Sequence, residues 1–131
     1  MARKNIPEDI KLTVLELIAD FRDNIFTKPS EVGDLLLVEF FFKKMSALDV
    51  TNKIVTHVLP YKTKIENREV NFFIIKKKEI FANLPMERVE YFANLVQSPP
   101  NNGGMSDENK RCVWAYFDTL VELAEEYKKN K

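Results

Sequence analysis

The sequence predicts an all-α protein, a compact, bundle-like single domain of five or six helices that spans residues 1–131. Apolar residues recur every three or four positions along most of the chain, which is the period of a helix with one buried face. Proline, glycine and helix-capping residues separate these periodic segments. With 131 residues and a 45% hydrophobic composition, the chain can enclose one hydrophobic core.

The clearest element is a long amphipathic helix from Ser106 to Lys131. Ser106 is a suitable N-cap, and the acidic Asp107 and the basic Lys128 are placed to complement the two ends of the helix dipole. One stripe of this helix is apolar and the opposite side is charged, which predicts a helix that supports the core. The stripe contains Val113, Phe117, Leu120, Val121, Ala124 and Tyr127, with Trp114 beside it.

The first helix is predicted over residues 7–26. Pro7 suits a first helical turn, and Pro29 disfavours a helical conformation at the residue before it. Its apolar positions keep helical spacing, so one face should be buried. These positions are Ile10, Val14, Leu17, Ile18, Phe21 and Ile25.

The second helix is predicted to follow an N-cap at Ser30 and to continue to Met45, through the segment L-L-L-V-E-F-F-F at 35–42. A buried strand is the alternative for that segment, because periodicity cannot decide short apolar runs. A segment that is apolar on all sides should be central, so we expect the C-terminal helix to pack along residues 35–45. The residues that bury the segment 35–42 could belong to one subunit or to two.

A third helix is predicted to begin at Ser46, which forms a capping-box-like pair with Asp49, and to end near Pro60. A helix over about 67–83 is less distinct, because V-N-F-F-I-I at 70–75 also suits a strand. The region from 61 to 84 could therefore be one helix, two helices or partly strand.

Pro85 opens a further helix over about 86–96. The loop Q-S-P-P-N-N-G-G-M that follows is predicted to be irregular. Gly103 and Gly104 precede the C-terminal helix without a phosphate-binding motif around them, which favours a flexible joint.

Lys plus Arg and Asp plus Glu both number 20, so the protein has no overall positive charge that would attract it to nucleic acid or to an anionic membrane. Cys112 is the only cysteine, so no intramolecular disulfide can form, and the N-terminal residues do not resemble a signal peptide. The longest apolar run is far shorter than the roughly 20 residues of a membrane-spanning helix. We therefore expect an intracellular protein in a reducing compartment, without a membrane span.

Candidate catalytic groups are few. His57 is the only histidine, and its position favours a half-buried side chain with a local hydrogen bond. Cys112 lies early in the long helix, where a thiolate would be stabilised, but a packed and unreactive thiol is favoured. The carboxylate pairs Asp20–Asp23 and Glu125–Glu126 favour solvated roles. No catalytic residue, metal site, cofactor or small-molecule site is predicted.

Two binding surfaces are candidates. Lys76, Lys77 and Lys78 could contact a nucleic-acid backbone, although nearby glutamates favour a solvated helix face. Aromatic side chains that the core cannot cover would form a protein interface, although most should be core. The candidate interface residues are Phe41, Phe72, Tyr91, Trp114 and Tyr116.

Residues 40–129 resemble small helical proteins, mostly uncharacterised, of nucleocytoplasmic large DNA viruses. The resemblance rests on the phrases L-P-M-E-R-V-E-Y-F at 84–92 and W-A-Y-F-D at 114–118. It implies a role in the virion or the infected host cytoplasm, and it assigns no catalytic residue.

These observations lead to one expectation and one alternative. The expectation is a non-enzymatic protein-interaction or structural protein, such as a minor virion component, that binds a protein partner or itself. The alternative is a nucleic-acid-binding accessory protein that uses the lysine-rich helix face.

Overall fold

The computed structural model describes residues 5–25, 28–69, 72 and 86–129, and these residues form an all-α fold without strands. Within these described ranges, five α-helices have eleven residues or more and one short α-helix accompanies them, which confirms the predicted fold class. The helices are α1 (Ile6–Asp20), α2 (Pro29–Lys44), α3 (Ala47–His57), α4 (Lys62–Glu66), α7 (Met86–Gln97) and α8 (Asp107–Lys129).

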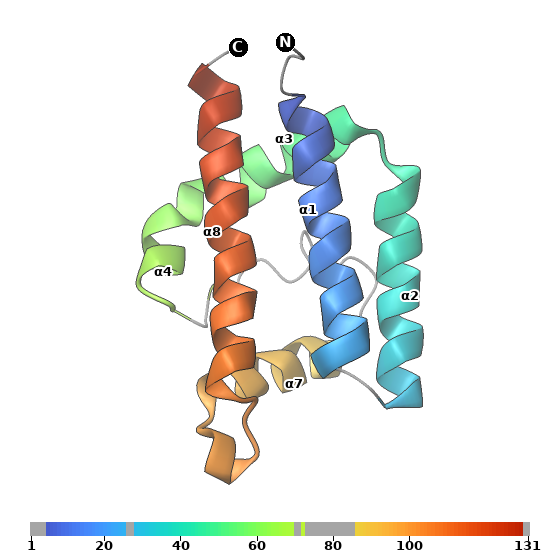
Figure 1. The fold of residues 1–131 in the computed structure, drawn as a ribbon, viewed down its shortest axis with the longest axis vertical. Helices are drawn as coiled ribbons and strands as arrows, with labels where there is room; N and C mark the ends of the chain where they lie inside the picture. The colour runs from blue at the N-terminus through green and yellow to red at the C-terminus, as the bar shows by residue number, and fades with distance from the viewer. Residues whose placement is uncertain (1–4, 26–27, 70–71, 73–85, 130–131) are drawn as a thin grey trace.

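Three upright helices lie side by side, with α1 between α8 and α2 and antiparallel to both (Figure 1). Helix α3 crosses one end of this layer and α7 crosses the other. The expectation that the C-terminal helix packs along residues 35–45 is therefore wrong, because α8 packs mainly on α1. Both α8 and α2 use α1 as their principal neighbour.

Helix starts follow the sequence signals closely. Ser46 Oγ accepts a hydrogen bond from Asp49 N at 3.0 Å, and Ser106 Oγ accepts one from Asn109 N at 3.1 Å. The two predicted N-caps are thus confirmed. Helix α2 instead begins at Pro29, before the predicted cap at Ser30. Proline suits the first helical position because the N–H it lacks would have no partner there.

Helix α2 is fixed to α1 near its middle and at its C-terminus. Lys11 Nζ donates to the main-chain oxygens of Lys43, at 3.1 Å, and Met45, at 2.7 Å, so a cation lies at the negative end of the α2 dipole. A π-helical turn, η1 (Phe21–Ile25), continues α1. From this turn Arg22 Nη1 donates to Glu39 Oε1 at 2.8 Å. These contacts set the position of α2 along α1.

The core lies between α1, α3 and α8. Ile10 and Val113 are fully buried, and the rings of Phe72 and Phe117 meet edge to face with centroids 5.6 Å apart. Most of the predicted apolar stripe of α8 is buried as expected. Its buried members are Val113, Phe117, Leu120, Val121 and Ala124.

The predicted helix over 67–83 begins differently in the structure. Helix α4 is already complete at Glu66, and Arg68 adopts the left-handed conformation with φ of 56°, which ends the helical path. Phe72 is fully buried. Residues 70–71 and 73–85 lie outside the described residues, so the rest of this helix stays a prediction.

The expected flexible joint is a close-packed turn. After the short 3-10 helix η3 (Pro100–Asn102), Gly103 adopts a left-handed φ of 85°. A Cβ on Gly104 would lie 1.9 Å from Ser98 O, so only glycine fits beside that backbone. Met105 N then donates to Leu95 O at 2.9 Å, which joins the turn to α7.

Gly104→Ala should therefore destabilise the protein by about 1 to 3 kcal/mol, because the α7–α8 backbone must move to admit the methyl group. Gly33→Ala is the matched control, since a Cβ there meets nothing within 4 Å and Gly33 lies inside α2. The control should gain up to about 1 kcal/mol of stability. Urea denaturation of dilute protein measures both changes, and equal stabilities of the two variants would refute the close packing at Gly104.

Candidate functional site

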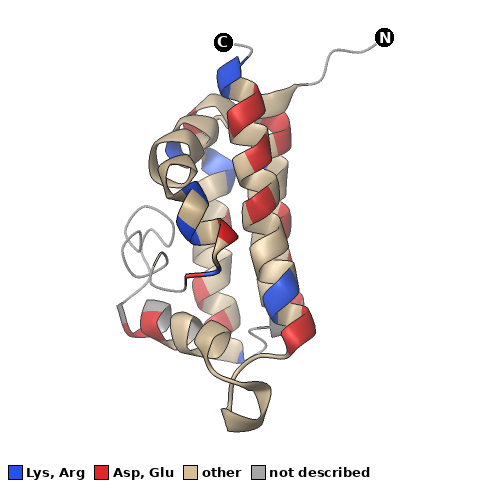
Figure 2. Cartoon of the chain, turned by 90° about the vertical axis from the view of Figure 1, so that its left-hand side faces the viewer, with Lys and Arg blue, Asp and Glu red and all other residues tan. Residues whose placement is uncertain are grey.

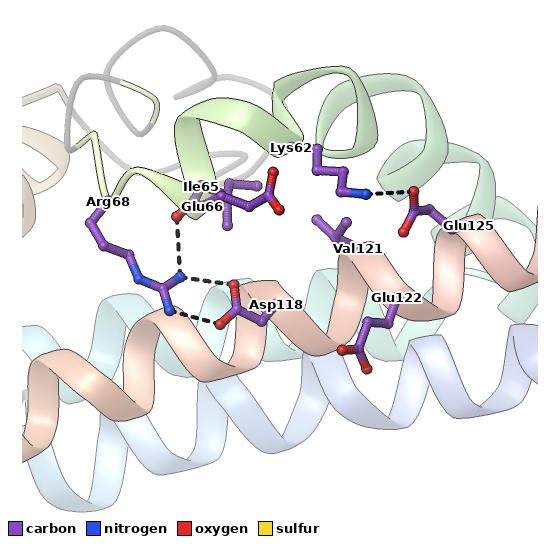
Figure 3. Close-up of a pocket in the computed structure, with 8 residues that line it drawn as sticks. All are labelled: Lys62, Ile65, Glu66, Arg68, Asp118, Val121, Glu122 and Glu125. Carbon is purple, nitrogen blue, oxygen red and sulfur yellow. Dashed lines mark hydrogen bonds and ion pairs between the residues drawn. The ribbon is translucent and has the colours of Figure 1, made fainter.

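A cavity of about 500 Å³ opens between α4 and α8 (Figure 3). Ile65 and Val121 are its apolar residues, and both side chains are almost fully buried. Charged side chains from both elements surround them. The described residues that line it are Lys62, Ile65, Glu66, Arg68, Asp118, Val121, Glu122 and Glu125.

Two ion pairs bridge this cavity. The Arg68 guanidinium donates to both carboxylate oxygens of Asp118 at 2.8 Å, and its Nη1 also donates to Ile65 O at 3.1 Å. Lys62 Nζ lies 2.9 Å from Glu125 Oε2. The pKa of each cation is raised, chiefly by the hydrogen bond to its carboxylate partner. Arg68, whose backbone has a left-handed φ of 56°, makes this bidentate contact from the turn that follows α4.

These charges join α4 to α8. Figure 2 shows acidic segments along α8, and the two ion pairs place the cations of residues 62–68 against them. Among the described lining residues, Lys62, Asp118 and Glu125 are held in these ion pairs. Within the described part of the chain, no three histidine, cysteine or acidic side chains are grouped to hold a metal ion. The two ion pairs across the cavity favour a structural role in joining residues 62–68 to α8.

The candidate catalytic residues are dispersed. His57 is half-buried at the end of α3, in agreement with the predicted half-burial. Cys112 is exposed, so the expectation of a packed thiol is wrong. Val113, the next residue along α8, faces the core, and the helical turn between them directs the two side chains about 100° apart.

Tyr116 is half-buried on α8, where the carboxylates of Asp20 and Glu16 on α1 act on its hydroxyl. Burial raises the pKa of Tyr116 most, and the charges of the two carboxylates and a hydrogen bond with Asp20 raise it further. The Tyr116 hydroxyl is thus part of the contact between α1 and α8.

Two of the predicted interface aromatics are core residues. Phe72 is 0% exposed and Trp114 is 5% exposed, so neither side chain can reach a partner in this fold. Phe72 is covered by Phe117 and Tyr61, and Trp114 lies under the Arg68 guanidinium, 5.5 Å from the ring centre. Amino-acid type alone cannot separate such core aromatics from exposed ones.

The other three predicted aromatics are half-buried, Tyr116 on α8 as described above and Phe41 and Tyr91 on two further helices. Phe41 packs edge to face on Phe42 at 5.4 Å and lies 5.9 Å from Lys53 Nζ. Tyr91 on α7 lies 6.0 Å from Lys28 Nζ. The candidate nucleic-acid residues Lys76, Lys77 and Lys78 lie outside the described residues.

Among the described residues, five large apolar side chains are exposed, and three of them lie together on α2, where the sequence led us to expect a central segment. The other two, Leu12 and Leu48, lie singly on α1 and α3. Leu36 is 47% exposed, Leu37 is 64% exposed and Phe40 is 58% exposed. Leu35, Val38 and Phe42 on the same helix are buried. The expectation that the whole segment is central is therefore wrong, since one side of α2 packs inward and the other faces solvent (Figure 1).

We define the α2 outer face as Gly33, Leu36, Leu37, Phe40 and Lys44. All five residues are exposed, and Lys44 Nζ lies 4.4 Å from the centre of the Phe40 ring. Successive members are separated by three or four residues, apart from the adjacent leucines, so they line one side of the helix. This is the spacing by which one helix packs on another.

No protein-family model, no curated protein and no solved structure matches this chain. The described residues contain no helix that is both long enough and apolar enough to cross a membrane. The α2 outer face is thus the candidate site on structural grounds alone.

The Tyr116 environment predicts a specific pH dependence. Since its folded pKa lies above the ordinary value of 10.0, the native protein keeps a proton that the unfolded chain releases above that pH. The free energy of unfolding should fall as pH rises past 10, and Tyr116→Phe should reduce that fall. Tyrosinate absorbance and chemical denaturation across this range measure both effects, with Tyr127→Phe as the control. A Tyr116→Phe profile identical to wild type would refute the predicted shift.

Proposed function

We propose that this protein is a non-enzymatic protein-interaction domain whose contact surface is the α2 outer face. The observation that supports the proposal is the adjacent exposure of Leu36, Leu37 and Phe40 on one helix. Contiguous exposed apolar surface on a folded domain is typical of a protein-binding site, because covering it gains hydrophobic free energy.

The attachment of α2 to α1 supports the same proposal. Lys11 holds the C-terminal end of α2, and Arg22 bonds to Glu39 in its middle. A helix fixed at two points loses little conformational freedom on binding, so more of the hydrophobic gain remains as affinity. The outer face is therefore a pre-organised surface.

The setting that we propose is intracellular. A single exposed thiol, Cys112, would readily form intermolecular disulfides in an oxidising compartment, so a reducing one suits it better. The resemblance of residues 40–129 to large DNA virus proteins makes a minor virion component the specific form of this proposal. The nucleic-acid alternative rests on Lys76, Lys77 and Lys78 and stays a prediction.

A photo-crosslinking amino acid at Leu37 tests the contact surface. We expect it to capture a polypeptide, either in the purified protein or in extracts of the natural source, because the α2 outer face is covered by protein. The same group at Glu122, exposed on α8, is the control and should capture much less.

Phe40→Glu in the Leu37-labelled protein should abolish the capture while leaving the melting temperature nearly unchanged, since Phe40 is 58% exposed. Equal capture from residues 37 and 122, or none from residue 37, would refute the proposed surface.

A further inference from the structure

We propose that the α2 outer face is the interface of a two-fold symmetric dimer, in which α2 packs antiparallel on α2 of a second copy. In this dimer Phe40 of each copy lies over Gly33 of the other. The inference rests on the proposed function and names the partner as the protein itself.

Gly33 provides the first argument. It lies inside α2, it has no left-handed φ, and a Cβ added there would meet nothing within 4 Å. Neither the backbone conformation nor any internal contact of the monomer therefore requires glycine. Glycine is the least favourable residue in a helix interior after proline. Its place on the apolar outer face is explained if another molecule approaches the backbone closely at this point.

The order of residues on the outer face provides the second argument. Gly33 lies three residues before Leu36, and Phe40 lies three residues after Leu37. A two-fold axis between Leu36 and Leu37 therefore places the largest side chain of each copy opposite the residue without a side chain. A two-fold dimer needs a self-complementary surface, and this face meets that requirement for antiparallel helices. A parallel pair would instead oppose Phe40 to Phe40.

Charges at the ends of α2 determine how the dimer should respond to salt. Lys28 is exposed before the helix and Lys44 is exposed at its end, so antiparallel pairing brings these like charges near each other. Salt screens such repulsion at the rim, so added salt should strengthen the dimer. A heterologous partner that recognised the lysines through its carboxylates would show the opposite dependence.

The size of the face determines the expected affinity. Its large apolar residues, Leu36, Leu37 and Phe40, span little more than one helical turn, so the area of the interface should be less than the roughly 800 Å² per partner of a standard interface. We therefore expect a weak and reversible dimer, with a Kd on the order of 10 to 100 µM. Such a dimer is monomeric when dilute and associated at high concentration.

Sedimentation equilibrium over roughly 1 µM to 1 mM tests the dimer through its concentration dependence. Gly33→Ala should raise the melting temperature of dilute protein but weaken dimerisation by about tenfold or more, because the added methyl group separates the two helices. Leu12→Ala is the control, since Leu12 is a comparably exposed leucine on α1, outside the face. It should dimerise as wild type does.

Disulfide crosslinking in a Cys112→Ser background tests the antiparallel orientation. Leu36→Cys lies beside the two-fold axis and should crosslink between copies under mild oxidation. Lys44→Cys should not, because the two positions would lie roughly 22 Å apart along the helix axes. Efficient crosslinking at both positions would overturn the antiparallel orientation.

The outcomes separate this inference from the proposed function. A strict monomer throughout the concentration range, with Leu37 crosslinked to a different polypeptide, would overturn the dimer and keep the protein-interaction role. Dimerisation unchanged in Gly33→Ala, or weakened by added salt, would also overturn the inferred interface. A monomer that captures nothing from residue 37 would overturn both proposals.

Discussion

The structure depends on burying α1 on several sides. Ile10, Val14 and Ile18 are 0 to 7% exposed, and the helix contacts α8, α2 and α3. Because α1 occupies the centre of the layer, the long C-terminal helix and α2 pack on its two flanks without meeting extensively. The free energy of this burial, roughly 1.5 to 3 kcal/mol for each large apolar side chain, is the main term that holds the three helices together.

This central position has a consequence for α2. A helix at the edge of a single layer has one principal neighbour, so only part of its circumference can be buried. The contacts of Lys11 and Arg22 with α2 fix which part that is. With Leu35 and Val38 directed inward, the outer face must contain Leu36, Leu37 and Phe40. Their exposure therefore follows from the topology of the fold and the spacing of a helix.

Elements whose signals are local could be predicted from the sequence. Ser46 and Ser106 begin helices because a hydroxyl can satisfy a nearby main-chain N–H, which requires no knowledge of the rest of the fold. Features set by distant residues could not be predicted. Trp114 is covered by Arg68, which lies 46 residues away in sequence, and its exposure depends on that contact. The all-round apolar pattern of α2 indicated two apolar sides without identifying what covers each.

That pattern also explains why the α2 outer face is a better candidate site than the α4–α8 cavity. In the cavity, Arg68 is bonded to Asp118 and Lys62 to Glu125, so a ligand would have to displace contacts that already satisfy the charges. On α2, a partner would displace only water from Leu37 and neighbouring apolar surface. A helix that is apolar on two sides needs two neighbours to bury both of them. Helix α1 is the first, and we propose that the second comes from another molecule.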